Sequence, residues 1–327
     1  FFFESLSFEM LLAVWSFIQW AVTILLVLPF FGYLLTNFSW AIFGSQNLKK
    51  KYNATWGLVT GSSSGIGKEV AIKLASQGIN VVLVALGDAT FDTTHEELKK
   101  AFPEREFRKV PCDLSDGTGS WMKDVVNATE DIDVQLLFNN AGYILTGFFH
   151  HRPVEVHLAN FHCNLTATIH LTHHFYSKML EKKLKGAIVF TSSAAGFIPN
   201  PFAVCYGLTK AAVSELACSL AVEARAKGID VCAIHPSPVK SRFMEGGGNK
   251  VTVDKLEMFD AAYKMATGPE ALPDKIFACV GRPCISVDLG GVAVGMRLMV
   301  MSLSYALLTF GFALFAPFMP DYKKHDK

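Results

Sequence analysis

The apolar residues of this chain form a long uncharged stretch near each end, with short β-branched runs between them. The first stretch, residues 10–35, is long enough to cross about 30 Å of hydrocarbon as a helix. A cleaved signal peptide is its main rival. The stretch exceeds a usual signal core, however, and no small-residue cleavage pattern follows it. We therefore expect residues 1–48 to form an N-terminal membrane anchor.

The second uncharged stretch covers residues 298–319 and contains Gly311 and Pro317. It could span a membrane, enter and leave on one side, or pack on the protein's own surface, and we expect membrane contact. Three lysines at residues 49–51 follow the first stretch, which places the folded part on the cytosolic side. If the second stretch also crossed, the lysines at residues 323–327 would lie on the opposite side. That conflict favours a segment that dips into the membrane or lies flat on it.

Between these ends, the pattern alternates between strands and helices. Helical periodicity appears in segments such as residues 69–75 and 211–216. Apolar strands that alternate with helices are typical of a parallel sheet covered on both faces, so we predict an α/β, Rossmann-type doubly wound fold. No linker divides residues 49–292, which we expect to be one domain, followed by an apolar helix and basic tail at 293–327. The predicted strands are residues 57–60, 81–84, 134–138, 187–190 and 231–234.

Composition excludes some classes of function. The formal net charge of +1 gives no reason to expect a nucleic-acid partner, and the seven cysteines show neither a CxxC pair nor metal-ligand spacing. His170 and His174 have the spacing of a metal pair, but no nearby carboxylate supports them. We therefore predict no metal site. The mean hydropathy of +0.30 is high for a soluble protein, and the excess lies in the two end segments.

Tyr206 and Lys210 stand four residues apart and thus share one face of a predicted helix. An ammonium beside a phenol lowers the pKa of the phenol from its usual value of about 10. The pair is therefore a candidate proton donor and acceptor.

Three polar segments precede this pair, each at the carboxyl end of a predicted strand. The turn at residues 60–67 (TGSSSGIG) opens a helix, and its glycines let the backbone approach a pyrophosphate. Residues 139–142 (NNAG) and 192–196 (SSAAG) follow two later strands. Open α/β sheets bind ligands at this edge, so we expect a dinucleotide site there.

These motifs resemble those of the short-chain dehydrogenase/reductase family over roughly residues 53–291. The resemblance rests on the glycine turn, the NNAG segment, Tyr206 with Lys210, and Ser193 thirteen residues before Tyr206. It implies an NAD(P)-dependent enzyme acting on CH–OH and C=O groups. Ser193 would polarise the carbonyl, Tyr206 would exchange the proton, and Lys210 would tune Tyr206 and hold the ribose. Asn164 would anchor a proton-relay water.

The resemblance also assigns the cofactor contacts. Three of the implied roles have alternatives. Ser192 rather than Ser193 could be the reactive serine. Asn164 could be an ordinary helix-face amide, and Asp113 could cap the following turn. Pro236 is followed by Ser237, where the family usually has glycine. The implied cofactor-binding residues are Gly61, Ser63, Ser64, Gly65, Ile66, Gly67, Asp113, Asn140, Ala141, Gly142, Tyr206, Lys210, Pro236 and Val239.

The choice between NAD(H) and NADP(H) depends on the segment after the second strand. Family members that prefer NAD usually have an aspartate where Ala85 stands, and those that prefer NADP often have an arginine where Leu86 stands. Asp88 would disfavour a 2′-phosphate, whereas Lys68 would favour it. By similarity to membrane-bound relatives that reduce lipid ketones, we expect NADP(H) rather than NAD(H).

An anchored hydride-transfer enzyme suggests a lipophilic substrate dissolved in the bilayer. The layout resembles membrane-bound hydroxysteroid dehydrogenases and 3-ketoacyl-CoA or 3-ketosphinganine reductases, which implies the endoplasmic reticulum or another organelle membrane. The loop at residues 241–267 contains three glycines at 246–248 and could close over an apolar substrate, or simply pack a helix. The apolar residues of this loop are Phe243, Met244, Leu256, Met258 and Phe259.

Two non-enzymatic alternatives remain open. The chain could be a structural or accessory subunit of a membrane complex that retains a nucleotide, or a lipid- or retinoid-binding protein. In the family, the helices that carry Asn164 and Tyr206 form a dimer seam, which implies a homodimer.

Overall fold

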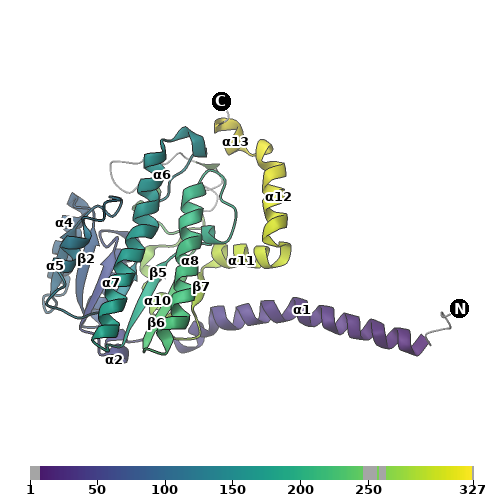
Figure 1. Ribbon diagram of the computed structural model, residues 1–327, viewed down its shortest axis with the longest axis horizontal. Helices are drawn as coiled ribbons and strands as arrows, with labels where there is room; N and C mark the ends of the chain where they lie inside the picture. Colours follow the sequence, from purple (N-terminus) through teal and green to yellow (C-terminus); the bar gives the residue numbers. More distant parts are fainter. Residues whose placement is uncertain (1–7, 246–255, 258–262, 326–327) are drawn as a thin grey trace.

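The computed structural model describes residues 8–245, 256–257 and 263–325 (Figure 1). Within these residues, a seven-stranded parallel sheet has the order β3-β2-β1-β4-β5-β6-β7. The chain adds strands outward from β1 in one direction (β2, β3) and then from β4 in the other, so the switch point of a doubly wound fold lies between β1 and β4. This confirms the predicted class. The strands are β1 (Trp56–Thr60), β2 (Asn80–Ala85), β3 (Phe107–Pro111), β4 (Val134–Asn139), β5 (Gly186–Thr191), β6 (Ile229–Pro236) and β7 (Ser286–Leu289).

The five predicted strands are confirmed, but the sequence analysis missed the two edge strands. β3 carries Arg108 and Lys109, whose charges interrupt the apolar pattern, and both side chains reach acidic partners at the surface. β7 is only four residues long and includes Asp288. Edge strands do not need the continuous apolar run of a central strand, so pattern alone misses them.

Helices cover both faces of the sheet. Apolar side chains of α2, α3, α4 and α10 pack on one face, and those of α5, α7 and α8 pack on the other. The helices on the sheet are α2 (Leu48–Tyr52), α3 (Gly65–Ser76), α4 (Ala89–Ala101), α5 (Met122–Asn127), α6 (Val154–Phe161), α7 (Ala167–Glu181), α8 (Val204–Arg225) and α10 (Pro273–Cys279).

The first apolar stretch is a single helix, α1 (Phe8–Phe43), that projects from the domain in Figure 1. Its outer part exposes large apolar side chains such as Trp15, Phe17 and Leu25. Its last turns instead contact β7 and α10, and Asn37 is buried there. In the described part of the chain, α1 is the one helix that is long and apolar enough to cross a membrane by itself.

The second apolar stretch is not one straight helix. It divides into α11 (Gly291–Leu303) and α12 (Tyr305–Phe315), which meet at Ser304 with a bend of 102°. α13 (Pro320–His325) follows and returns to the domain, where the ring of Tyr322 lies 5.3 Å from that of Phe148. Both ends of the segment therefore touch the same domain, as a re-entrant or flat-lying segment would require.

Candidate active site

The turn after β1 needs glycine for its backbone conformation and for close packing. Gly61 and Gly65 have positive φ values of 64° and 57°, which favour glycine. A Cβ added to Gly67 would lie 2.2 Å from the carbonyl oxygen of Gly61, so no larger residue fits there. α3 begins at Gly65 and directs its free N–H groups at the turn. The predicted residues Ser63 and Ser64 lie in this turn, and Ile66 lies in the first turn of α3.

The NNAG segment forms the second wall of the cradle. The Oγ1 atom of Thr60 accepts hydrogen bonds from the backbone N–H groups of Asn140 and Ala141, both at 2.9 Å. The side-chain amide of Asn140 donates to the carbonyl of Thr60 at 3.1 Å. A Cβ on Gly61 would lie 2.9 Å from the Cα atom of Ala141. The two segments are thus held in contact at the switch point of the sheet.

At the expected adenosine end, Asp113 behaves as the turn-capping alternative described. Its Oδ1 atom accepts from the backbone N–H of Ser115 at 2.9 Å and from the Ser115 hydroxyl at 2.5 Å. Contact between Asp113 and the cofactor stays a prediction.

Three charged side chains contact α4, the helix that follows β2, or form its N-terminal cap. Asp88 caps α4, since its carboxylate accepts from the N–H of Phe91 at 2.8 Å. Lys68 pairs with Glu97 at 2.5 Å. The guanidinium of Arg242 approaches Asp88 at 3.9 Å and donates to the hydroxyl of Thr90. The sequence analysis missed Arg242, because it comes from the loop after β6 and no local signal places it beside β2.

Asn164 lies in a π-helical turn, η2 (His162–Thr166), between α6 and α7. Such turns often occur at functional sites. Its side chain accepts from the N–H of Tyr143 and donates to the carbonyl of the same residue, both at 3.0 Å. A Cβ on Gly142 would lie 3.0 Å from Asn164 Oδ1 and 3.4 Å from Lys210 Nζ. The structure therefore brings Asn164 and Lys210 together over Gly142.

Tyr206 and Lys210 face each other across one turn of α8, and the ammonium nitrogen lies 5.6 Å from the centre of the phenol ring. Lys210 Nζ also donates to the carbonyl of Thr191 at 2.8 Å. Burial raises the pKa of Tyr206 to about 12, although its hydrogen bond with Ser193 acts in the opposite direction. Burial lowers the pKa of Lys210 to about 8. The expected lowering of the tyrosine pKa is thus wrong for this geometry, because loss of hydration outweighs the hydrogen bond with Ser193.

The two adjacent serines point to different partners. Ser192 is buried, and its hydroxyl donates to the carbonyl of Lys210 at 2.8 Å. Ser193 caps the turn η3 (Ala194–Gly196) and interacts with the phenol of Tyr206. This geometry agrees with Ser193 as the reactive serine.

The surroundings of the Tyr206 phenol are apolar. Tyr206 packs with Ile144 and Ala203, and the ring of Phe243 lies 5.7 Å from its own. In the loop at residues 241–267, which could close over a substrate, Leu256 is buried. The N–H of Glu257 in the same loop donates to Asp321 of α13 at 2.8 Å. Gly246–Gly248, Met258 and Phe259 lie outside the described residues.

The segment after β6 reaches the same edge. Val239 bridges to Thr267, and Ser237 accepts from the N–H of Ala293 in α11 at 3.0 Å. The serine that replaces the usual glycine thus ties this segment to the second apolar stretch. Contact of Pro236 and Val239 with the cofactor stays a prediction.

The family of this chain can be identified by comparison with known proteins. Residues 55–250 match the family model described as short chain dehydrogenase. The chain belongs to this family. Its NAD(P)-dependent oxidoreductase chemistry fits the cradle and the Tyr206–Lys210 pair.

Two relatives and one solved structure illustrate the similarity. A very-long-chain 3-oxoacyl-CoA reductase-like protein of Arabidopsis thaliana is 31% identical over 64% of this chain and 66% of its own length. The 17-beta-hydroxysteroid dehydrogenase type 3 of Mus musculus is 30% identical over 72% of this chain and 76% of its own. A short-chain dehydrogenase from Sphingobium yanoikuyae, solved with NADPH, is 26% identical with a TM-score of 0.62 and covers 76% of this chain and 95% of that one. The chain thus spans about two thirds of the length of the first of these relatives.

Proposed function

We propose that this short-chain dehydrogenase is membrane-bound and transfers a hydride between a nicotinamide cofactor and a lipophilic ketone or alcohol of the steroid, 3-oxoacyl or sphingoid type. The observation that carries this proposal is the apolar setting of Tyr206, among Ile144, Ala203 and Phe243. Phe148 contacts both Phe202, which precedes α8, and Tyr322, which follows the apolar helix α12. The names of the relatives, which include acyl-CoA and steroid enzymes, support the same class of substrate.

Each group of site residues would have its own role in the reaction. When bound, the nicotinamide would supply or accept the hydride. The cradle at residues 60–67 would hold the pyrophosphate. Ser193 would donate a hydrogen bond to the substrate oxygen while Tyr206 gives up its proton. Lys210 would return a proton to Tyr206, and Asn164 would anchor the water that relays it from solvent.

We propose NADP(H) rather than NAD(H), and Arg242 is the reason. A guanidinium matches a phosphate in shape and charge better than an ammonium does. Arg242 contacts Asp88 and Thr90 just after β2, near where the 2′-phosphate of NADP is recognised in this fold. Its 3.9 Å contact with Asp88 is looser than the 2.5 Å pair of Lys68 with Glu97. Asp88, the residue that would oppose a phosphate, is engaged as the cap of α4.

The membrane arrangement is part of the proposal. α1 would cross the bilayer and α12 would lie within or against it, with residues 1–48 as anchor, 49–292 as catalytic domain and 293–327 as the second membrane segment. Exposed Phe310, Leu314 and Phe315 give α12 the apolar surface that this needs. The domain would face the cytosol, at the endoplasmic reticulum.

A homodimer is proposed through α7 and α8. Ile169, Leu208 and Val222 are exposed apolar residues on these two helices. Mass photometry of the detergent-solubilised protein would show twice the chain mass, and a monomer at micromolar concentration would refute the dimer.

The test of function is NADPH oxidation by the full-length protein in detergent. A long-chain 3-oxoacyl-CoA and a steroid ketone would be compared with a short-chain 3-oxoester. Each buried methylene contributes about 0.8 kcal/mol, roughly fourfold in affinity, so kcat/KM should be at least ~100-fold higher for the lipophilic ketones. Equal turnover of long and short ketones would refute the lipophilic site. NADPH binding without any turnover would favour an accessory subunit.

A further inference from the structure

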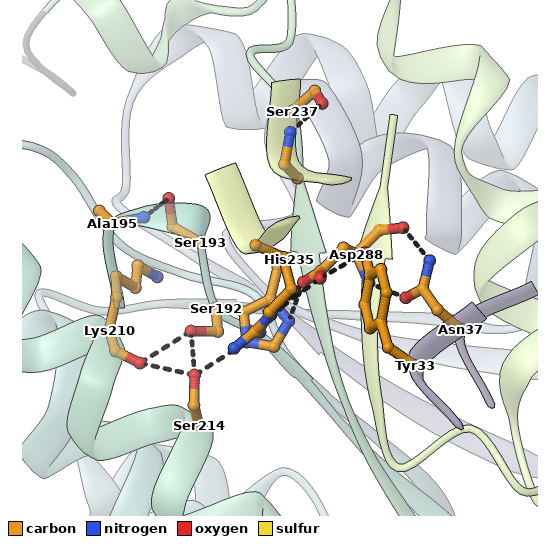
Figure 2. A network of polar contacts seen from close by, with 12 residues as sticks. Tyr33, Asn37, Ser192, Ser193, Ala195, Lys210, Ser214, His235, Ser237 and Asp288 are labelled. Carbon is orange, nitrogen blue, oxygen red and sulfur yellow. Dashed lines mark hydrogen bonds and ion pairs between the residues drawn. The ribbon is translucent and has the colours of Figure 1, made fainter. Parts of the chain in front are cut away.

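A buried carboxylate joins the anchor helix to the sheet. Asp288 in β7 is 2% exposed and accepts from the Tyr33 hydroxyl of α1 at 3.0 Å. Arg297 of α11 contacts the same carboxylate through Nε at 3.0 Å and through a terminal nitrogen at 3.2 Å. His235 Nδ1 of β6 lies 3.1 Å from its Oδ1 atom. Figure 2 shows Tyr33, His235 and Asp288 converging at this point.

The backbone of Asp288 is held by α1 as well. The side-chain amide of Asn37 donates to the Asp288 carbonyl at 3.2 Å, and its oxygen accepts from the Asp288 N–H at 2.7 Å. Asn37 thus occupies the free hydrogen-bonding edge of β7, as a further strand would. An amide that replaces strand pairing in this way fixes the position of α1 relative to the sheet.

From Asp288 the contacts continue to the reactive helix. His235 is fully buried, and its Nε2 atom lies 2.9 Å from the hydroxyl of Ser214. Ser214 donates to the carbonyl of Lys210 at 2.9 Å, and Ser192 lies 2.7 Å from Ser214. Because Ser192 also bonds the same carbonyl, two hydroxyl groups fix the backbone of Lys210.

A second path leads to Ser193. The Arg297 guanidinium lies 3.5 Å from the centre of the Phe197 ring, and that ring packs edge-on against His235 at 5.5 Å. Phe197 directly follows the turn capped by Ser193. Burial would raise the pKa of Asp288, but the contacts from His235 and Arg297 outweigh it, so that pKa lies below its ordinary value. The centre of the network is therefore an ionised carboxylate.

We propose that Asp288, His235 and Ser214 form a positioning relay that fixes Lys210 and the Ser192–Ser193 segment relative to α1 and α11. The seating of the membrane helices on the domain thereby sets the geometry of the reactive groups. None of the three relay residues touches substrate or cofactor in the proposed function, on which this inference rests. They act through Lys210 and Ser193.

A double-mutant cycle across the relay tests this proposal. Tyr33→Phe removes only the hydroxyl on α1, and Ser214→Ala removes the hydroxyl that bonds Lys210. Each change should lower kcat by on the order of tenfold, within the ~100-fold that a 1 Å misplacement can produce, with the KM for NADPH unchanged. The double variant should lose less than the product of the two single losses, because both break one relay. Losses that multiply, or single variants with wild-type kcat, would overturn the relay.

Matched controls come from the same helices. Thr36→Ala removes a hydroxyl of α1 that bonds only the carbonyls of Gly32 and Tyr33, and Ser219→Ala removes one on α8 that bonds Glu215. Both side chains are exposed, and kcat should stay at the wild-type value. A loss in the controls equal to that of Tyr33→Phe would assign the effect to general weakening of the helices and overturn the proposal.

A second readout does not depend on turnover. Hydrogen exchange of the substrate-free protein should be faster over residues 206–214 in Tyr33→Phe than in Thr36→Ala. If the wild-type protein reduces no ketone, the proposed function is refuted. The exchange measurement still tests the relay in that case, because it needs no turnover. Faster exchange confined to α1 and β7 would show a purely structural network and overturn the inference.

Discussion

The two halves of the sheet's carboxyl edge are built by different means. The cofactor half, at β1 and β4, consists of backbone and small residues within residues 60–67 and 139–142. The reactive half, at β5 to β7, depends on side chains that meet over long separations, such as Tyr33 and Asp288, 255 positions apart. Each wall of the pyrophosphate cradle is thus a short local motif, and the fold is needed to pair Thr60 with Asn140, 80 positions apart. The setting of the reactive groups depends more heavily on such long-range contacts.

Asp288→Asn should have the largest effect on stability, because it breaks the reactive half at its centre. It leaves Arg297 without its anionic partner, so the free energy of unfolding should fall by about 3 kcal/mol, near the lower end for a broken buried ion pair. The matched control is Asp133→Asn, since Asp133 pairs with Lys182 at the surface.

The same variant predicts a pH dependence. The folded-state pKa of Asp288 is lowered, so its contribution to stability is present above the unfolded pKa of about 3.9 and is lost as pH falls through the folded value. The difference between wild type and Asp288→Asn, measured by chemical denaturation in detergent, should be full at pH 7 and shrink below about pH 4. A difference that grows on acidification would contradict an ionised carboxylate.

Gly67→Ala should break the cofactor half alone. The added methyl group would meet the Gly61 carbonyl at 2.2 Å and push the turn out of place. We expect the Kd for NADPH, measured by fluorescence titration, to rise at least ~100-fold, about 2.7 kcal/mol. Gly295→Ala is the control, because nothing lies within 4 Å of a Cβ there. An unchanged Kd would show that the turn does not hold the cofactor.

The pH profile of ketone reduction separates the roles of Lys210 and Tyr206. With a pKa of about 8, Lys210 loses its proton well before Tyr206, whose pKa is about 12. Reduction consumes a proton, so kcat/KM should fall above about pH 8, approaching tenfold per pH unit. A constant kcat/KM up to pH 10 would show that Lys210 does not take part in the proton transfer.

Arg242→Ala should have the smallest effect of these variants, and it tests whether the cofactor half recognises the 2′-phosphate. We expect the KM for NADPH to rise about tenfold, the value of one charge-assisted hydrogen bond, while the KM for NADH stays constant. Lys68→Ala is the control, because Glu97 already neutralises that ammonium. Equal changes with both cofactors would show that Arg242 does not recognise the 2′-phosphate.

The sequence predicts the central strands, the glycine turn and the Tyr206–Lys210 pair, because each depends on spacing within one strand, turn or helix. Asn164 and Ser193 lie on other elements, and their roles come from the resemblance to the family. The sequence does not predict β3 and β7, whose charged or short sequences lack the apolar run. It also gives the wrong direction for the pKa of Tyr206, since spacing shows the neighbouring charge but not the loss of hydration.

The residues that the sequence analysis missed share one cause. Arg242 reaches β2 from the loop after β6, and Asp288 meets Tyr33 only because β7 receives the end of α1. Their sequence neighbours form no motif. Such contacts depend on strand order and helix docking, which pattern analysis does not give.

The most direct test of the central claim is hydride transfer from NADPH to a lipophilic ketone by the full-length protein and its Tyr206→Phe variant. The ring and its packing remain in this variant, and only the proton donor is lost. We predict that the wild type reduces the ketone and that Tyr206→Phe is ~10²–10⁴-fold slower, with a Kd for NADPH within a few-fold of wild type. Tyr176→Phe, a change on α7, should keep the wild-type rate. Equal rates for Tyr206→Phe and wild type would contradict a carbonyl-reducing site at Tyr206.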